Sequence, residues 1–241
     1  MAPIVGKAAY RSPAVSIRGA GSLWLALGVP AVLVVLVGCV AFILWPRWPG
    51  AAATSDAPSL PITIGGYLFN VPPAAIRVPL QRHAGPQERI DLAFLWPELT
   101  PPDPTAKPAL HQEPLTFDRL FISLSGFSGT LSAAERFRQI YPRYFADGQF
   151  AGPDGLIVKR FRDGTPYQGD DLFYDPIMPD PFMARCSRPG IGETPGICLV
   201  ERRIGGAVDV TIRFPRDWLI EWRTLANAID HVIRTLRPPS G

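Results

Sequence analysis

The feature that most constrains this chain is an uncharged apolar run from Leu23 to Trp45, which is 23 residues long. A helix of that length spans roughly 35 Å at about 1.5 Å per residue, and the hydrocarbon core of a bilayer is about 30 Å thick. Trp24 and Trp45 stand near the two ends of the run, where amphipathic rings prefer the membrane interface. The run therefore predicts a transmembrane helix over residues 23–45, through which the chain binds a lipid bilayer.

The charges around the run predict its orientation. Lys7, Arg11 and Arg18 precede it without any acidic residue, and the rest of the 24 Lys and Arg balance the 21 Asp and Glu. By the positive-inside rule the basic tail, residues 1–22, stays in the cytoplasm and the C-terminal part is exported. We therefore predict a bacterial inner-membrane protein with a periplasmic domain. The neutral charge of that domain also argues against a nucleic-acid partner, which the chain-wide pI near 8.9 would otherwise indicate.

The apolar run leaves the manner of anchoring open. An uncleaved signal-anchor is favoured because the run exceeds the usual length of about 7 to 15 residues in a signal peptide. A cleaved signal with its cleavage site at Ala51–Ala53 is a second interpretation. The third is lipid attachment, because Leu36–Cys39 resembles the lipobox of bacterial lipoproteins. That resemblance implies cleavage before Cys39 and lipidation of its thiol, although the apolar residues 40–45 depart from the pattern.

The composition beyond the run predicts one exported domain on a tether. Residues 46–61 are rich in Pro, Ala and Gly and predict the tether. Residues 62–241 are numerous enough to enclose a hydrophobic core. Most of the 28 prolines fall here, which favours short strands and many loops. We predict an α+β domain with a mainly antiparallel sheet and two packed helices.

Residues 197–204 and 207–214 are the clearest strands, joined at Gly205-Gly206, a pair typical of tight hairpins. Apolar residues alternate with polar ones along the second of these strands, which indicates one buried face. A capping box opens a helix at Ser132, with a break expected at Pro142, and an amphipathic helix is expected over residues 218–236. Further strands are expected at residues 62–70, 75–80, 89–96, 119–125, 156–161, 172–174 and 182–188.

Cys186 and Cys198 are the two cysteines outside the apolar run. Each lies in a predicted strand, and turn-forming residues separate the two strands. In an exported domain such a pair is expected to form a structural disulfide. The chain-entropy model assigns a loop of this length about 3 kcal/mol of stabilisation.

The sequence provides little support for catalysis. Its three histidines, His83, His111 and His231, have no metal-ligand spacing, and we predict no catalytic residue and no cofactor. The densest acidic stretch is Asp163–Asp175. Asp170, Asp171 and Asp175 are the candidate metal ligands in it, but alternating Asp, Gly and Pro is also typical of ordinary turns, which we favour.

Three functions remain open. The first is a non-catalytic periplasmic domain that binds an envelope protein partner or supports an assembly. The second is an anchored hydrolase that uses the Asp163–Asp175 loop. The third is a periplasmic protein that protects the cell against a toxin. The absence of a catalytic motif favours the first, and the third is a weaker alternative that also requires no catalytic motif.

Overall fold

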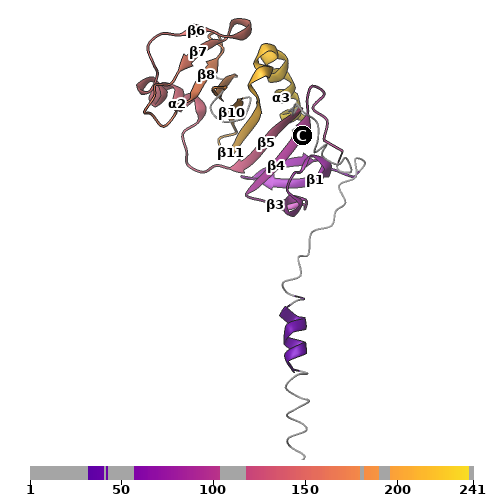
Figure 1. Cartoon of the computed structure of the whole chain (residues 1–241). Helices are drawn as coiled ribbons and strands as arrows, with labels where there is room; N and C mark the ends of the chain where they lie inside the picture. The colour runs from indigo at the N-terminus through magenta and orange to yellow at the C-terminus, as the bar shows by residue number, and fades with distance from the viewer. Residues whose placement is uncertain are drawn as a thin grey trace, which may run out of the picture. The chain divides into compact units, whose positions relative to one another are not determined.

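The structure is a computed structural model that describes residues 32–40, 42, 57–103, 118–179, 182–189 and 196–238. Contacts divide the chain into two units, Met1–Arg47 and Trp48–Gly241 (Figure 1). In the first unit, residues 32–40 and 42 are helical and Cys39 is exposed. Among the described residues, no helix combines the length and the apolar character that crossing a membrane requires. Most of the expected 23–45 span and 46–61 tether lies outside the described residues, so both stay predictions.

The described part of the second unit is built on two sheets and two α-helices. The small sheet has the order β2-β1-β3 and the large one the order β4-β5-β11-β10-β9-β8-β7-β6. The strands are β1 Leu60–Ile64, β2 Tyr67–Val71, β3 Gly85–Pro86, β4 Arg89–Leu95, β5 Arg119–Gly126, β6 Phe150–Ala151, β7 Ile157–Arg160, β8 Asp170–Tyr174, β9 Met183–Ser187, β10 Ile197–Ile204 and β11 Val208–Pro215. The helices are α2 Ala133–Gln139 and α3 Trp222–Leu236, and short 3-10 helices are η1 Pro73–Ala75, η2 Pro79–Gln81, η3 Tyr141–Arg143, η4 Pro153–Gly155 and η5 Arg216–Glu221.

The predicted α+β class is confirmed, and every neighbouring pair in the large sheet is antiparallel. The hairpin of β10 and β11 turns at Gly205-Gly206, where both glycines have positive φ. That conformation is disfavoured for residues with a Cβ, and it matches the twist of the strands. Gly65-Gly66, also at positive φ, joins β1 to β2 in a two-residue turn, one residue shorter than the connection of β10 to β11, so the single strand expected over residues 62–70 is a hairpin.

The strand expected at residues 75–80 is wrong. Residues 73–75 and 79–81 form η1 and η2, with a proline at the first position of each. Proline has no backbone N–H and a fixed φ, so it suits the first position of a helical turn and cannot donate to a strand neighbour. Only Ile76 between the two turns makes a β-bridge, to Leu92 of β4.

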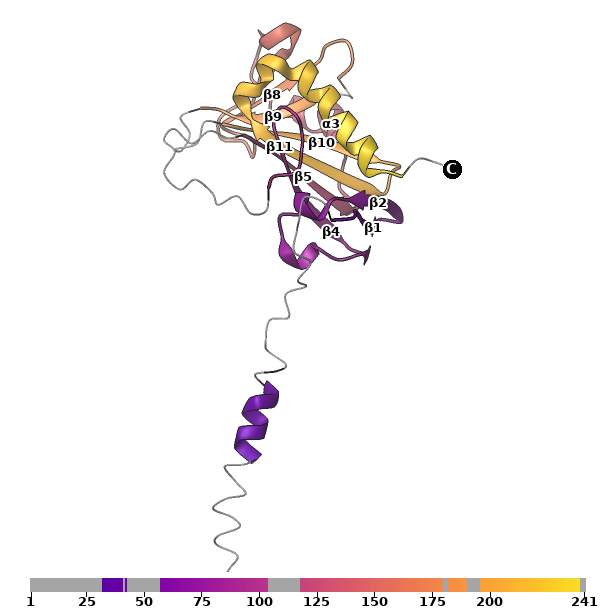
Figure 2. The same cartoon turned by 90° about the vertical axis from the view of Figure 1, so that its right-hand side faces the viewer.

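Helix α3 covers one face of the large sheet (Figure 2). Its buried residues are Trp222, Leu225, Ile229, Val232 and Leu236, which recur at three- and four-residue steps. They pack on the alternate apolar residues of β11, and β1 and β2 contribute to the same core. Burial of each such side chain contributes about 1.5–3 kcal/mol, so packing rather than helix propensity holds α3 in place.

Helix α2 covers part of the opposite face. Ser132 and Glu135 form the predicted capping box, and the helix ends before Pro142, which lies in η3. Tyr141 joins Phe161, Leu172 and Met183 in a second, smaller core. Because this core lies over β8 and β9, the two α-helices leave most of β4, β5 and β11 uncovered on this side, although Gln81 of η2 hydrogen-bonds Asp91 of β4.

Candidate functional site

The uncovered side of the large sheet is the candidate functional surface. On β11, Val208, Val210, Ile212 and Phe214 are buried under α3. Because successive side chains of a strand point to opposite faces, Asp209, Thr211 and Arg213 face the other way. The strand register places their neighbours on β4, β5 and β10 beside them. We call this surface the open face, and it comprises Arg89, Asp91, Ala93, Phe121, Ser123, Ser125, Leu199, Glu201, Arg203, Asp209, Thr211 and Arg213.

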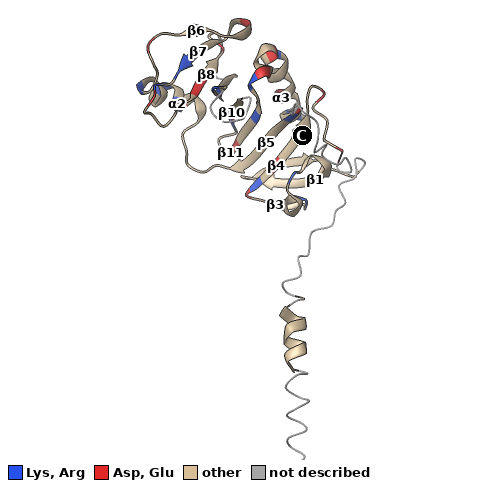
Figure 3. Ribbon diagram, in the orientation of Figure 1, with Lys and Arg blue, Asp and Glu red and all other residues tan. Residues whose placement is uncertain are grey.

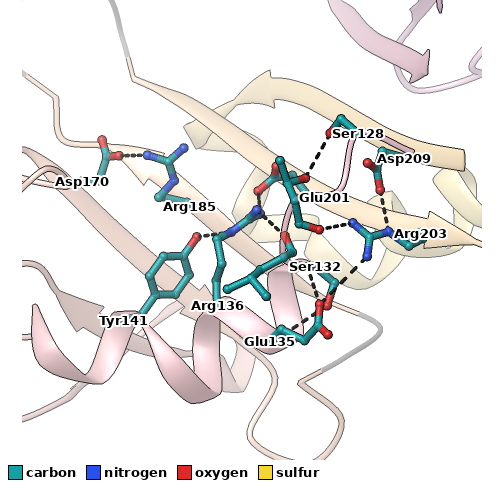
Figure 4. Close-up of polar contacts among 12 residues, drawn as sticks. Ser128, Ser132, Glu135, Arg136, Tyr141, Asp170, Arg185, Glu201, Arg203 and Asp209 are labelled. Atoms are coloured by element: carbon teal, nitrogen blue, oxygen red, sulfur yellow. Dashed lines mark hydrogen bonds and ion pairs between the residues drawn. The ribbon is translucent and has the colours of Figure 1, made fainter. Parts of the chain in front are cut away.

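A cleft of about 160 Å³ lies where α2 and the loop before it meet the open face. Arg136 of α2 forms an ion pair with Glu201 of β10 (Figure 4). It also donates to the Tyr141 hydroxyl at 3.2 Å and to the Leu131 carbonyl at 2.7 Å. Burial lowers the pKa of Arg136, but the charge of Glu201 and the Tyr141 hydroxyl outweigh it and raise that pKa. Arg136 therefore stays charged and ties α2 to the sheet.

Arg203 forms the second wall of the cleft. Its Nε donates to Asp209 Oδ1 at 2.7 Å, and its Nη2 donates to the Thr130 carbonyl at 2.7 Å. Its guanidinium also lies 4.4 Å from the centre of the half-exposed Phe127 ring. The Ser132 backbone N–H donates to Glu135 at 2.7 Å and lowers the pKa of that carboxyl, which lies 4.0 Å from Arg203. Since these charges are neutralised within the cleft, its electrostatics offer little to a charged ligand.

Ser123 and Asp91 are the strongest polar pair elsewhere on the open face. The Ser123 hydroxyl donates to Asp91 Oδ1 at 2.6 Å, and Arg89 and Gln81 donate to the same carboxylate at 2.8 and 3.1 Å. Burial raises the pKa of Asp91, but these three hydrogen bonds outweigh it and lower the pKa to about 2. A carboxylate with so low a pKa is a poor general base at neutral pH.

The described histidines do not supply a base for a serine nucleophile. His83 contacts the carbonyl of its neighbour Ala84, and His231 is exposed on α3. No hydrogen bond joins either of these two to a serine, and His111 lies outside the described residues. Within the described ranges, no serine has the histidine partner that would activate it as a nucleophile.

The structure separates the aspartates that the sequence marked as candidate metal ligands. Asp170 and Asp171 are neighbours on β8 and face opposite sides of the sheet. Asp170 pairs with Arg185 at 2.8 Å, whereas the buried Asp171 pairs with Arg188 and Arg216 at 2.9 and 2.8 Å. Asp175 accepts the backbone N–H of Ile177 at 2.9 Å. In the described part of the chain, no three His, Cys, Asp or Glu side chains converge as metal ligands would.

Cys186 and Cys198 form the predicted disulfide between β9 and β10. Both cysteines are fully buried, and they are directly paired across the two strands. Cys186 also pairs with Asp171 on its other side. The disulfide and the Asp171 ion pairs therefore brace the same segment of the sheet.

Glu201, Arg202 and Arg203 are consecutive on β10, and their side chains divide between the two faces of the sheet. The structure places Glu201 and Arg203 on the open face, while Arg202 points the other way and pairs with Asp230 of α3. The period-2 alternation of β10 could have revealed this division. Basic and acidic residues are interspersed over the sheet and α3, in line with the balanced charge of the domain (Figure 3).

Comparison with solved structures provides a further guide. Smlt3025, an immunity protein of the Stenotrophomonas maltophilia type IV secretion system, superposes with a TM-score of 0.54 and 14% identity, covering 75% of this chain and 94% of that protein. The Neisseria meningitidis iron-regulated outer membrane lipoprotein FrpD superposes with a TM-score of 0.43 and 12% identity, covering 76% of this chain and 92% of that one. The first likeness indicates a shared fold, and the second is too weak to do so. No protein-family model and no curated protein sequence matches the chain.

Proposed function

We propose that this chain is a toxin-protective protein of the bacterial envelope, which acts by binding a protein partner. The observation that carries the proposal is the fold shared with the immunity protein Smlt3025 over 94% of that protein's length. The buried disulfide supports an oxidising compartment such as the periplasm. The apolar run at residues 23–45 supplies the anchor in this proposal, with the N-terminus in the cytoplasm and the domain in the periplasm.

The geometry of the described residues supports binding over hydrolysis. Asp170 and Asp171, the candidate acids of a hydrolase, lie on opposite faces of β8 and are engaged by arginines. Glycoside hydrolysis requires two carboxyl groups that flank one bond, so this pair does not provide the required site. By contrast, the open face is a broad, mainly polar surface that the two α-helices leave largely uncovered, which suits a protein partner.

Kin competition tests this function and does not require the toxin to be identified. A strain deleted for this gene is mixed with its parent at high density on a solid surface, and survivors of each are counted. If the protein neutralises a toxin that siblings deliver on contact, recovery of the deletion strain falls and expression of the full chain restores it. The same mixture in dilute liquid culture is the control. Equal recovery of both strains on the solid surface would contradict the proposal.

A further inference from the structure

A second recess lies at the end of the open face that is remote from α2. It has a volume of about 230 Å³, and three arginines and an apolar floor line it. Arg213 of β11 stands directly opposite Phe121 of β5 in the strand register. Arg77 follows η1 and places its guanidinium 4.3 Å from the centre of the Phe121 ring. We call this recess the arginine pocket, and its other lining side chains are Arg119, Ile197 and Pro215.

The arginine pocket differs in charge from the rest of the open face. In the cleft near α2 each arginine has a carboxylate partner, as described above. Here Arg77 and Arg213 are exposed and form no ion pair among the described residues. Arg119 approaches Asp118 at 3.5 Å, and both of those side chains are largely exposed, so this contact is screened by solvent. The described pocket therefore carries an excess of positive charge.

The floor of the pocket adds an apolar contact surface beside those charges. Ile197 is 43% exposed, and the Phe121 ring is half-buried beneath Arg77. Arginine and aromatic side chains, including Phe, are enriched in the buried centres of protein interfaces. A guanidinium also presents donors in a fork that matches a carboxylate. The recess is smaller than the 300–1,000 Å³ or so of typical small-molecule sites, which suits one or two side chains.

We propose that the arginine pocket docks an acidic segment of the protein partner, in which an Asp or Glu stands next to a large apolar side chain. The inference rests on the proposed function, because it names the surface through which the partner is bound. The carboxylate pairs with Arg77 and Arg213, and the apolar side chain covers Phe121 and Ile197. An anionic lipid headgroup matches the charge alone, whereas the segment matches both the charge and the apolar floor.

Peptide binding to the full chain in neutral detergent tests the pocket directly. The probe is fluorescein-labelled Gly-Asp-Phe-Glu-Gly, and Gly-Asn-Phe-Gln-Gly with the same label is its match with neutral side chains. We expect the acidic probe to bind more tightly, and Arg77→Glu/Arg213→Glu to weaken it about tenfold or more. The control Arg138→Glu/Arg237→Glu reverses two exposed arginines that also lack ion pairs among the described residues, and it should retain binding. Equal binding of both probes, or an equal loss in both variants, would overturn the proposal.

A competition arm separates a lipid from a peptide. Dihexanoylphosphatidylglycerol, below its micelle concentration, is added to the protein with the acidic probe. If the acidic probe does not bind the wild type while the lipid raises the melting temperature of the wild type but not of Arg77→Glu/Arg213→Glu, the pocket is a lipid site and the proposal fails. Both variants must keep the melting temperature and disulfide of the wild type, so that a lost fold is not mistaken for a lost site.

The kin-competition assay then distinguishes the site from the function. If the deletion strain is killed and Arg77→Glu/Arg213→Glu fails to protect it while the control variant protects, both proposals are supported. If the deletion strain is killed and the charge-reversed variant protects fully, the pocket is wrong and the function stands. If the deletion strain survives, the function is wrong, and the peptide measurement alone decides whether the pocket binds acidic segments.

Discussion

Asp171 is the buried charge on which the stability of this sheet depends most directly. Its side chain is 5% exposed, and its two oxygens accept from Arg188 at 2.9 Å and from Arg216 at 2.8 Å. Asp171→Asn keeps the shape of the side chain, removes its charge and turns an amide N–H₂ toward one of the arginines. Breaking a buried ion pair from one side costs about 3–5 kcal/mol, because the partner charge is left uncompensated.

The surroundings of Arg188 and Arg216 reduce the free-energy cost expected for Asp171→Asn. Arg188 also donates to the carbonyls of Phe161 and Asp170, and Arg216 donates to the carbonyl of Ser187. Their side chains are 27% and 19% exposed, so water partly solvates the uncompensated charge. We therefore expect Asp171→Asn to lower the free energy of unfolding by about 2–3 kcal/mol. For a domain of this size that corresponds to a decrease in melting temperature of about 4–12 °C.

The matched control lies one residue earlier on the same strand. Asp170 pairs with Arg185 at 2.8 Å, but the two side chains are 21% and 29% exposed. Asp170→Asn should therefore cost only about 0.5–1 kcal/mol. Both variants are melted as full-length protein in neutral detergent without reductant, and tryptophan fluorescence reports unfolding. If Asp171→Asn melts within 1 °C or so of Asp170→Asn, the argument from burial is refuted.

Three further predictions use the same melting assay. Replacing Cys186 and Cys198 together by serine should lower the free energy of unfolding by about 3 kcal/mol, because the cross-link closes a loop over a sequence separation of 12 residues. The control is the reduced wild type, which should be as stable as this variant. The pKa of Asp91 is lowered from 3.8 to about 2 in the folded protein. The ionised Asp91 therefore contributes about 2 kcal/mol to the free energy of unfolding above pH 4 or so, and this stabilisation is lost as the pH falls toward 2. Asp91→Asn should flatten that pH dependence. Ile229→Ala, in the fully buried face of α3, should cost about 2–5 kcal/mol, whereas Ile220→Ala, at 71% exposed, should change stability by about 0.5 kcal/mol or less.

Each of these three predictions has a result that would contradict it. Unchanged stability of the double serine variant would show that the cross-link does not stabilise the fold by restricting the unfolded chain, as the chain-entropy model requires. A pH profile of Asp91→Asn that parallels the wild type between pH 5 and 2 or so would assign the acid sensitivity to another carboxyl. Comparable losses for Ile229→Ala and Ile220→Ala would contradict the position of α3 on the sheet.

Local signals in the sequence determined much of this fold. Gly205-Gly206 between two alternating segments is sufficient to define a hairpin, because the turn and both strands are close in sequence. The apolar spacing of residues 222–236 likewise determined which side of α3 is buried. The cysteine pair was predictable because only turn-forming residues separate the two predicted strands that carry Cys186 and Cys198. The strand predicted at residues 75–80 does not form, because Pro73 and Pro79 favour helical turns more strongly than the apolar residues there favour a strand.

The tertiary structure alone decided the order of the strands and therefore the candidate surfaces. β5 pairs with β11, although about 80 residues of chain separate Ser125 from Asp209. This pairing brings Arg213 beside Phe121, and the bridge from Ile76 to β4 brings Arg77 over the same ring. Likewise, Asp171 meets Arg216 over a separation of 45 residues. Such contacts depend on how the elements bury their apolar faces together, and periodicity along a single segment contains no information about that arrangement.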